Sequence, residues 1–173
     1  MLQPSGYMRT AAWKHDIMPE VMNTVRITND GKPKIPFLAP ATDGVDLYFV
    51  EGQGYNSGSG IAQMSVAGGE TTWMPTSLRA VLAIPSISPD GSKLLVITSP
   101  SEGGSEGAEF WIQPLPAGNP FRIGRTAGSS ACFTPDGIHI LYEDAVRVVK
   151  IVNLDGSDPH PLATLPGLIH APR

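Results

Sequence analysis

The dipeptide Asp-Gly recurs along this chain at nearly constant spacing, each time just before a run of apolar residues. Its three copies place glycines at positions 44, 91 and 137, so the spacing is 47 residues and then 46. A period of this size marks an array of supersecondary units, none of which can bury its apolar face alone. The repeat therefore limits the chain to folds in which similar units stack, and it favours a binding surface over a self-contained active site.

Each copy of the repeat predicts a tight turn between two strands. Proline sets φ to about −65° at the start of such a turn, aspartate accepts hydrogen bonds from the following backbone, and glycine takes the position with positive φ. The first copy has Thr42 where the others have proline, so its turn is less typical. We assign a structural turn role to the repeated residues and to one later glycine: Asp43, Gly44, Pro89, Asp90, Gly91, Pro135, Asp136, Gly137 and Gly156.

Apolar runs and further glycine turns predict four antiparallel strands in each unit. After a short strand that leads into each turn, the expected strands are 46–51, 60–66 and 70–74, then 93–98, 109–115 and 121–124, then 139–143, 146–154 and 161–165. Both alternating faces of the strands that leave the turns are apolar, which is typical of strands enclosed between two layers. We therefore predict an all-β fold, a partial β-propeller built of four-stranded antiparallel blades.

The domain division follows the repeat. Residues 1–23 form an unassigned N-terminal extension, and 24–173 form the partial propeller, with units at about 35–80, 81–128 and 129–167 and partial blades at both ends. Residues 24–31 are expected to be the fourth strand of a preceding unit. The loop after the second strand varies most in length, and variable loops on one side of a repeat array commonly form its binding face. The candidate binding residues in these loops are Gln53, Tyr55, Asn56, Glu102, Ser105 and Glu106.

The turn Ser88-Pro89-Asp90-Gly91 with its apolar strand resembles the TolB-type propeller repeat, a relative of the WD repeat. Residues 133–142 are similar to the same pattern, and 153–159 resemble the family's turn between third and fourth strands. Residues 25–31 and 66–70 are similar to propellers attached to bacterial winged-helix transcriptional regulators. The resemblance covers about 24–173. It implies a bacterial regulator or envelope protein, and a periplasmic location if this chain is part of a longer protein.

The chain departs from that family in blade number. Complete TolB-like propellers have six or more blades, whereas about three are present here. An open array exposes blade faces and strand edges that aggregate unless they are covered. We expect either a fragment, which we favour, or two copies that complete a ring as a homodimer. Because no winged-helix segment is present, the resemblance implies no nucleic-acid binding by this chain.

Charge and hydropathy exclude several classes of partner. The net charge is −4 and only 16% of residues are charged, which gives no electrostatic case for binding nucleic acid or an anionic membrane. Residues 1–20 do not read as a signal peptide, and no run of 18 apolar residues occurs, so we expect no membrane contact by this chain. The single cysteine, Cys132, permits no intrachain disulfide and leaves the compartment open. We interpret it as a small buried apolar residue.

Two glycine-containing loops match functional patterns only in part. Residues 103–107 have the spacing of a nucleophile elbow, but that motif needs a strand before the serine and a helix after it, and Ser105 lies in a loop that feeds a strand. Residues 52–57 approach the dinucleotide fingerprint, but Ser57 replaces the third glycine and no helix follows. We interpret both segments as flexible loops, and we expect neither catalytic residues nor a cofactor.

The histidines and acidic residues show no metal-ligand pattern, and most aromatic residues lie on the expected strands. The four histidines follow no ligand spacing, and 155–158 lack the remaining ligands of a calcium loop, so we expect no metal site. Aromatic residues on the strands are expected to pack between blades. Trp13 and Trp73 lie outside that scheme and are candidates for an exposed contact.

The leading hypothesis is a non-catalytic propeller module for protein–protein interaction or ligand sensing, within a larger bacterial regulator or envelope protein. The first alternative is the gating propeller of a prolyl-oligopeptidase-type serine peptidase whose catalytic domain lies outside this chain. The second is a propeller fragment without function. The identity of the protein or small-ligand partner stays open.

Overall fold

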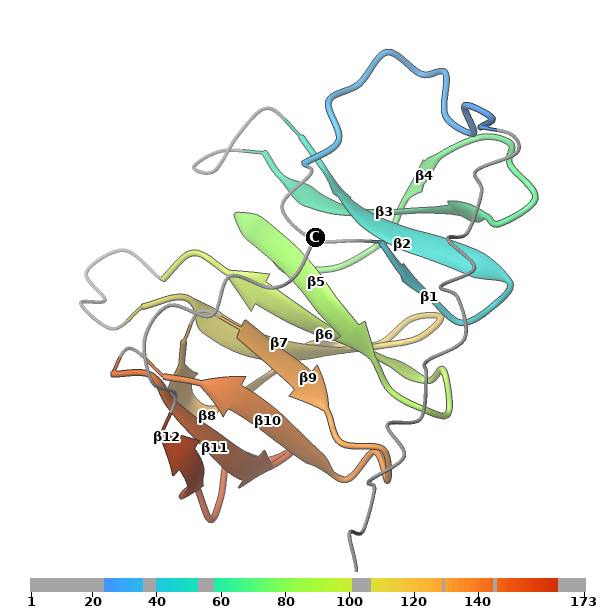
Figure 1. Cartoon of the computed structure of the whole chain (residues 1–173). Coiled ribbons are helices and arrows are strands. Elements are labelled where there is room, and N and C mark those ends of the chain that lie inside the picture. The colour runs from blue at the N-terminus through green and yellow to red at the C-terminus, as the bar shows by residue number, and fades with distance from the viewer. Residues whose placement is uncertain are drawn as a thin grey trace, which may run out of the picture.

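The computed structural model describes residues 24–35, 40–52, 58–100, 107–128, 130–144 and 146–164. Their strands form three four-stranded antiparallel sheets, each made of four strands consecutive in the chain, as Figure 1 shows. This is the all-β partial propeller that the sequence predicts. Blade 1 contains β1 (Ala41–Thr42), β2 (Asp46–Glu51), β3 (Gly60–Ser65) and β4 (Thr72–Trp73). Blade 2 contains β5 (Val81–Ile87), β6 (Lys93–Thr98), β7 (Glu109–Pro114) and β8 (Phe121–Ala127). Blade 3 contains β9 (Ser130–Phe133), β10 (His139–Glu143), β11 (Val148–Asn153) and β12 (His160–Thr164).

The strands that follow the Asp-Gly turns lie where the sequence predicts them. The bounds of β2, β6 and β10 coincide with the expected ranges, because each turn fixes where its strand begins. The outer strands differ more: β4 has only two residues, and β8 continues to Ala127, three residues beyond the expected end. The expectation of a strand over 24–31 is wrong, because residues 24–29 form no strand.

The first strand of blade 1 is interrupted. β1 pairs with the start of β2, Ala41 opposite Tyr48, while Lys34 forms an isolated antiparallel bridge with Glu51 at the other end of β2. The Ile35 N–H donates to the Val50 carbonyl at 3.0 Å. Since β3 occupies the other edge of β2 along its whole length, Lys34 and β1 share the same edge. The segment around Lys34 therefore holds the place that the start of β5 holds in blade 2.

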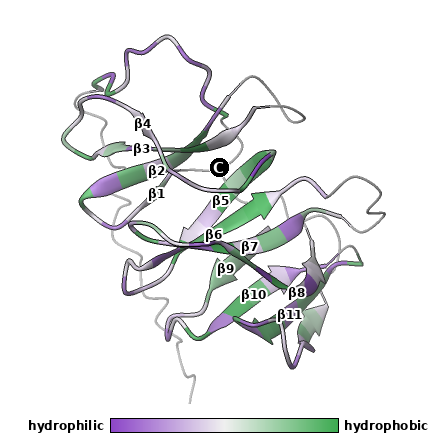
Figure 2. Ribbon diagram, turned by 180° about the vertical axis from the view of Figure 1, so that it is seen from behind, coloured by the Kyte–Doolittle hydropathy of each residue, from purple (hydrophilic) through white to green (hydrophobic). Residues whose placement is uncertain are grey.

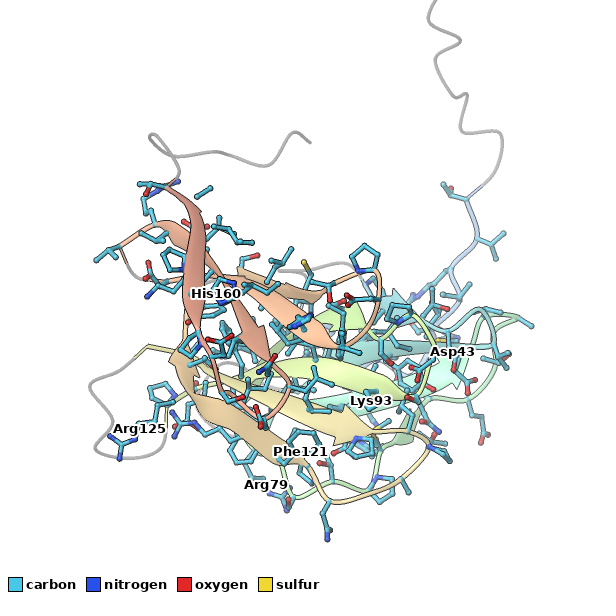
Figure 3. All side chains as sticks on the ribbon, turned by 90° about the horizontal axis from the view of Figure 1, so that it is seen from below. Asp43, Arg79, Lys93, Phe121, Arg125 and His160 are labelled. Atoms are coloured by element: carbon cyan, nitrogen blue, oxygen red, sulfur yellow. The ribbon has the colours of Figure 1, made fainter. Side chains whose placement is uncertain are left out.

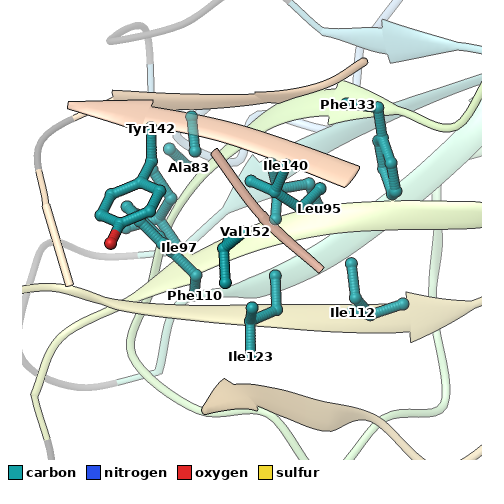
Figure 4. Close-up of a cluster of buried hydrophobic side chains, with 11 residues drawn as sticks. Ala83, Leu95, Ile97, Phe110, Ile112, Ile123, Phe133, Ile140, Tyr142 and Val152 are labelled. Atoms are coloured by element: carbon teal, nitrogen blue, oxygen red, sulfur yellow. The ribbon is translucent and has the colours of Figure 1, made fainter. Parts of the chain in front are cut away.

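The core consists of two hydrophobic clusters, one on each face of blade 2. Along β6, Leu94 and Val96 belong to the cluster shared with blade 1, whereas Leu95 and Ile97 belong to the cluster shared with blade 3. The first cluster comprises Ala41, Tyr48, Val50, Ile61, Met74, Leu78, Val81, Ile84, Leu94 and Val96. The second, shown in Figure 4, comprises Ala83, Leu95, Ile97, Phe110, Ile112, Ile123, Ala131, Phe133, Ile140, Tyr142 and Val152. The apolar faces expected on the second strands are thus enclosed on both sides in blade 2.

The blades meet along their first strands, and the array has two distinct ends. β5 contacts both β1 and β9. At the end drawn on the right of Figure 1, which we call the turn end, lie the three Asp-Gly turns. At the opposite end, which we call the loop end, β2, β6 and β10 finish and β3, β7 and β11 begin. Figure 2 shows apolar residues concentrated along the strands. Among the described residues, no helix is long and apolar enough to cross a membrane.

The interpretation of Cys132 as a buried residue is wrong. Its side chain is exposed, although neighbouring atoms desolvate the thiol enough to raise its pKa. Cys132 lies in β9 opposite Leu141, on the face of blade 3 that points away from blade 2. Its neighbours Ala131 and Phe133 point the other way and are buried. The alternation along β9 therefore places Cys132 on the face of blade 3 that no described blade covers.

Candidate binding surface at the loop end

The loop residues proposed from the sequence lie outside the described part of the chain. These are Gln53, Tyr55, Asn56, Glu102, Ser105 and Glu106. Their segments leave and re-enter the described structure at the loop end, between β2 and β3 and between β6 and β7. The candidate surface is therefore built from the strand ends and connections that flank these segments.

The aspartates of the three Asp-Gly turns, at the turn end, accept hydrogen bonds within their own turns. In each turn the aspartate Oδ1 accepts the backbone N–H two residues ahead, at 2.9 Å for Asp43, 3.0 Å for Asp90 and 3.1 Å for Asp136. Hydroxyl groups of Ser88 and Thr134 also donate to Asp90 and Asp136. These hydroxyls chiefly lower the pKa of Asp90 and Asp136, whereas backbone N–H groups lower that of Asp43. The carboxylates are thus engaged locally, and they hold the turns that space the strands.

A buried carboxylate marks the loop end of blade 1. Glu51, the last residue of β2, is fully buried. Its Oε2 lies 2.8 Å from Lys34 Nζ and its Oε1 lies 3.1 Å from Lys32 Nζ. Lys34 Nζ also lies 2.7 Å from Asp30 Oδ2. Because a buried charge is tolerated only when it is paired, the two lysines fix residues 30–34 onto the end of β2.

The same lysines lie over two aromatic rings. Lys34 Nζ is 5.6 Å from the centroid of the Phe49 ring, and Lys32 Nζ is 5.9 Å from that of Trp73, distances at which cation–π attraction operates. Trp73 is 46% exposed. It packs directly on Gly60, where an added β-carbon would lie 2.6 Å from Trp73 Cζ3. The indole is thus partly exposed and in contact with Gly60 and Lys32, and the expectation that Trp73 is available for contact agrees with its position.

We call this surface the Lys–Trp patch and define it as Asp30, Lys32, Lys34, Phe49, Glu51 and Trp73. Its electrostatics are set by the ion pairs within it. The hydrogen bond from Lys34 lowers the pKa of Asp30 to about 2. Desolvation opposes ionisation of Lys34, but its hydrogen bonds to Asp30 and Glu51 outweigh this and raise its pKa. Asp30 is therefore a carboxylate and Lys34 an ammonium at neutral pH. The patch contains two acidic and two basic side chains, so their formal charges cancel.

A hollow of about 230 Å³ lies beside the patch. Its lining includes Trp73, Ser59 just before β3, Ile61 in β3 and Arg79 from the connection to β5. Among the described residues, no group of three or more His, Cys, Asp or Glu side chains is arranged to hold a metal ion.

Sequence reasoning missed most of the Lys–Trp patch. One signal was present: Glu51 ends an otherwise apolar run, at the position that Thr98 holds in the second repeat. The two lysines gave no signal, because they lie between the strand expected over 24–31 and the first unit expected from about residue 35.

No protein-family model matches this sequence, and no curated protein matches it. Solved structures do share the fold. A protein described as TolB from Agrobacterium tumefaciens superposes with a TM-score of 0.58 at 18% identity, over 71% of this chain and 44% of that chain. TolB from Acinetobacter baumannii gives 0.50 at 18% identity, over 73% and 32%. The β-propeller domain of the Trilobed protease from Pyrococcus furiosus gives 0.52 at 16% identity, over 72% and 42%.

These similarities show the fold and its extent. Three four-stranded blades superpose on TolB and on a protease propeller, which agrees with the resemblance seen in the repeat residues. The chain spans less than half the length of each of these structures. Identities of 16–18% carry the architecture alone, so function must be argued from the surface of this chain.

Proposed function

We propose that this chain is a non-catalytic propeller module that binds a protein or small ligand at its loop end, within a larger bacterial regulator or envelope protein. The observation that carries the proposal is the Lys–Trp patch. It presents an exposed tryptophan, Trp73, whose ring packs on Gly60 and lies under the Lys32 ammonium. Tryptophan is among the residues most enriched at energetic centres of interfaces, and a ring fixed in advance loses little entropy on binding.

The polar groups of the patch support binding over catalysis. Within the described part of the loop end, Glu51 is paired with Lys32 and Lys34, and Asp30 with Lys34. Carboxylates held in ion pairs keep residues 30–34 fixed against the end of β2, and a rigid surface of this kind suits a binding module.

A propeller that serves a peptidase is the second candidate. The fold similarity includes a protease propeller, and acylaminoacyl peptidase from Pyrococcus horikoshii superposes over 71% of this chain with a TM-score of 0.50. Under this alternative the catalytic domain is encoded beside the present chain. The genomic sequence downstream of Arg173 distinguishes the two, because a Gly-x-Ser-x-Gly elbow followed by Asp and His favours the peptidase.

The face of blade 3 that points away from blade 2 carries apolar side chains, which suggests a site for a further blade. Leu141 occupies in β10 the repeat position that Leu95 occupies in β6, yet Leu95 is fully buried and Leu141 is half-exposed. Ile151 and Val149 lie beside it on the same face and are also half-exposed. Light scattering distinguishes the source of the covering blade. A dimer means that a second copy supplies it, and a monomer means that a longer protein does.

Photo-crosslinking tests the proposed interaction. The photoreactive residue p-benzoylphenylalanine is placed at position 73, and at position 121 as a control, because Phe121 is exposed to a similar degree, at 41%, but begins β8 at the turn end. In extract of the source organism we expect a discrete crosslinked species from position 73 that Lys32→Ala weakens. Equal products from positions 73 and 121 would contradict binding at the Lys–Trp patch.

A further inference from the structure

The hollow beside Trp73 has an apolar floor and a polar rim. Ile61 and Met74 form part of its lining and are both buried. Arg79, which precedes β5, is exposed at the rim, whereas Ser59, which precedes β3, is a buried part of the lining. Its volume, about 230 Å³, is below the roughly 300–1,000 Å³ of sites for drug-sized molecules. It therefore suits a ligand with the bulk of a single amino acid or a benzene ring with one substituent.

Ser59 supplies a hydroxyl that the fold does not use. The side chain is 2% exposed, and its Oγ has no hydrogen-bond partner within the described structure. Buried hydroxyls are nearly always paired, because leaving one unpaired forfeits its hydration without compensation. A group from outside the chain that hydrogen-bonds Ser59 Oγ would remove this penalty.

Arg79 supplies a cation whose position is fixed by the backbone. Its Nη1 donates to the carbonyls of Thr76 at 3.0 Å and Leu78 at 2.9 Å, which holds the guanidinium at the rim, and Figure 3 shows the side chain at the molecular surface. Arg122 and Arg147 pair with carboxylates, those of Glu109 at 3.3 Å and Glu143 at 3.7 Å. No carboxylate of the described residues lies within ion-pair distance of Arg79. The guanidinium can therefore accept an anionic partner.

The remaining polar side chain at the hollow is already engaged. Thr76 Oγ1 donates to Gln113 Oε1 at 2.5 Å and accepts the Leu78 N–H at 3.2 Å. The groups left for a ligand are thus one hydroxyl, one guanidinium and the indole of Trp73. A hydroxyl and a guanidinium together match the oxygens of a carboxylate, and an indole matches an apolar or aromatic body.

We infer that this hollow binds a small organic carboxylate, with the carboxylate between Arg79 and Ser59 and the apolar body against Trp73 and Met74. The inference rests on the proposed binding role of the loop end and names a ligand class for it. The carboxylate inference and the proposed function can fail independently of each other. Protein crosslinking at position 73 needs no small ligand, and carboxylate binding needs no protein partner.

Titration of the whole chain with benzoate and benzamide tests the inference. The two probes share size and shape, but only benzoate carries the charge. By calorimetry or ligand-observed NMR we expect benzoate to bind at least about tenfold more tightly than benzamide, since hydrogen bonds to charged groups are markedly stronger than neutral ones. Equal binding of the two probes, or no binding of benzoate, would overturn the proposal.

Matched variants assign the two donors. Arg79→Gln is expected to remove the preference for benzoate, whereas Arg125→Gln, at an exposed arginine of β8 that does not line the hollow, is expected to keep it. Ser59→Ala deletes an unpaired buried hydroxyl, so we expect weaker benzoate binding without loss of stability against urea. A marked loss of stability in Ser59→Ala would show that the hydroxyl serves the fold, and it would overturn the role given to Ser59. Circular dichroism of each variant establishes that it is folded.

Discussion

Leu94 and Leu95 are consecutive in β6 and both fully buried, yet they belong to different hydrophobic clusters on opposite faces of blade 2. Since neighbouring residues of a strand point to opposite faces, one short strand joins the cores of all three blades. The packing between neighbouring blades therefore encloses both apolar faces of β6.

Truncation of these leucines measures both interfaces. Leu94→Ala and Leu95→Ala are each expected to lower the free energy of unfolding by about 2–5 kcal/mol, because each leaves a cavity in a closed cluster. Leu141→Ala removes the same side chain at the position of β10 that corresponds to Leu95, but from a half-exposed site. We expect it to cost clearly less. Urea unfolding followed by circular dichroism gives all three values, and an equal cost for Leu141→Ala would mean that the face of blade 3 is covered in solution.

The turn between β11 and β12 depends on glycine for a steric reason. Gly156 has φ of +82°, and an added β-carbon would lie 2.4 Å from the backbone nitrogen of Gly124 in blade 2. Gly68, in the corresponding turn of blade 1, has φ of +89° and nothing within 4 Å. We expect Gly68→Ala to cost only the left-handed backbone strain of about 1–2 kcal/mol. Gly156→Ala adds a collision worth about 1–3 kcal/mol, measured by the same urea unfolding. Equal costs would contradict the close approach of the two blades.

The ion pairs of the Lys–Trp patch predict that removing the lysines costs more stability than neutralising Glu51. Removing both lysines, Lys32→Ala with Lys34→Ala, leaves the fully buried Glu51 carboxylate unpaired and is expected to cost about 3–5 kcal/mol. Glu51→Gln is expected to cost less, because the side chains of Lys32 and Lys34 are 47% and 26% exposed and can be hydrated once the carboxylate is gone. Chemical unfolding at pH 7 compares the two, and the reverse order would refute this account of the patch.

The parts of the fold that follow from short-range chemistry could be predicted from the sequence. The Pro89-Asp90-Gly91 turn and the alternation after it place β6 correctly, because turn geometry and strand period act within a few residues. The spacing of the repeat then gives the blades and their order, since each unit must stack to bury its apolar faces.

What could not be predicted depends on which surfaces meet. Cys132 points to the face opposite that of Ala131 and Phe133, as strand alternation requires. Its side chain is exposed because no described blade covers that face of blade 3. Lys34 pairs with β2 on the same edge as β1, although nothing in its local sequence indicates a strand. Pairing between Lys34 and Glu51 joins residues 17 positions apart, and neither turn signals nor periodicity report such a contact.

Acid titration tests the electrostatic account of the patch. The pKa of Asp30 is lowered from its ordinary 3.8 to about 2, chiefly by the hydrogen bond from Lys34. A carboxyl whose pKa is lower in the folded state contributes stability above its unfolded pKa, and this contribution is lost as the pH falls through the folded value. Asp30 therefore stabilises the fold at and above about pH 4, and that contribution disappears as the pH falls towards 2.

Lys34→Met separates this pair from the rest of the chain. It removes the chief cause of the shift while Lys32 still pairs with Glu51, so we expect the pKa of Asp30 to return towards 3.8 in a carboxyl-carbon NMR titration. The stability difference between the wild type and this variant should then narrow between pH 4 and pH 2. Lys93→Met, which removes the partner of Asp90 at 3.8 Å, serves as the control and is expected to leave the pKa of Asp30 unchanged. If the pKa of Asp30 is still near 2 without Lys34, the lysine does not stabilise this carboxylate. Other contacts must then fix residues 30–34 onto blade 1.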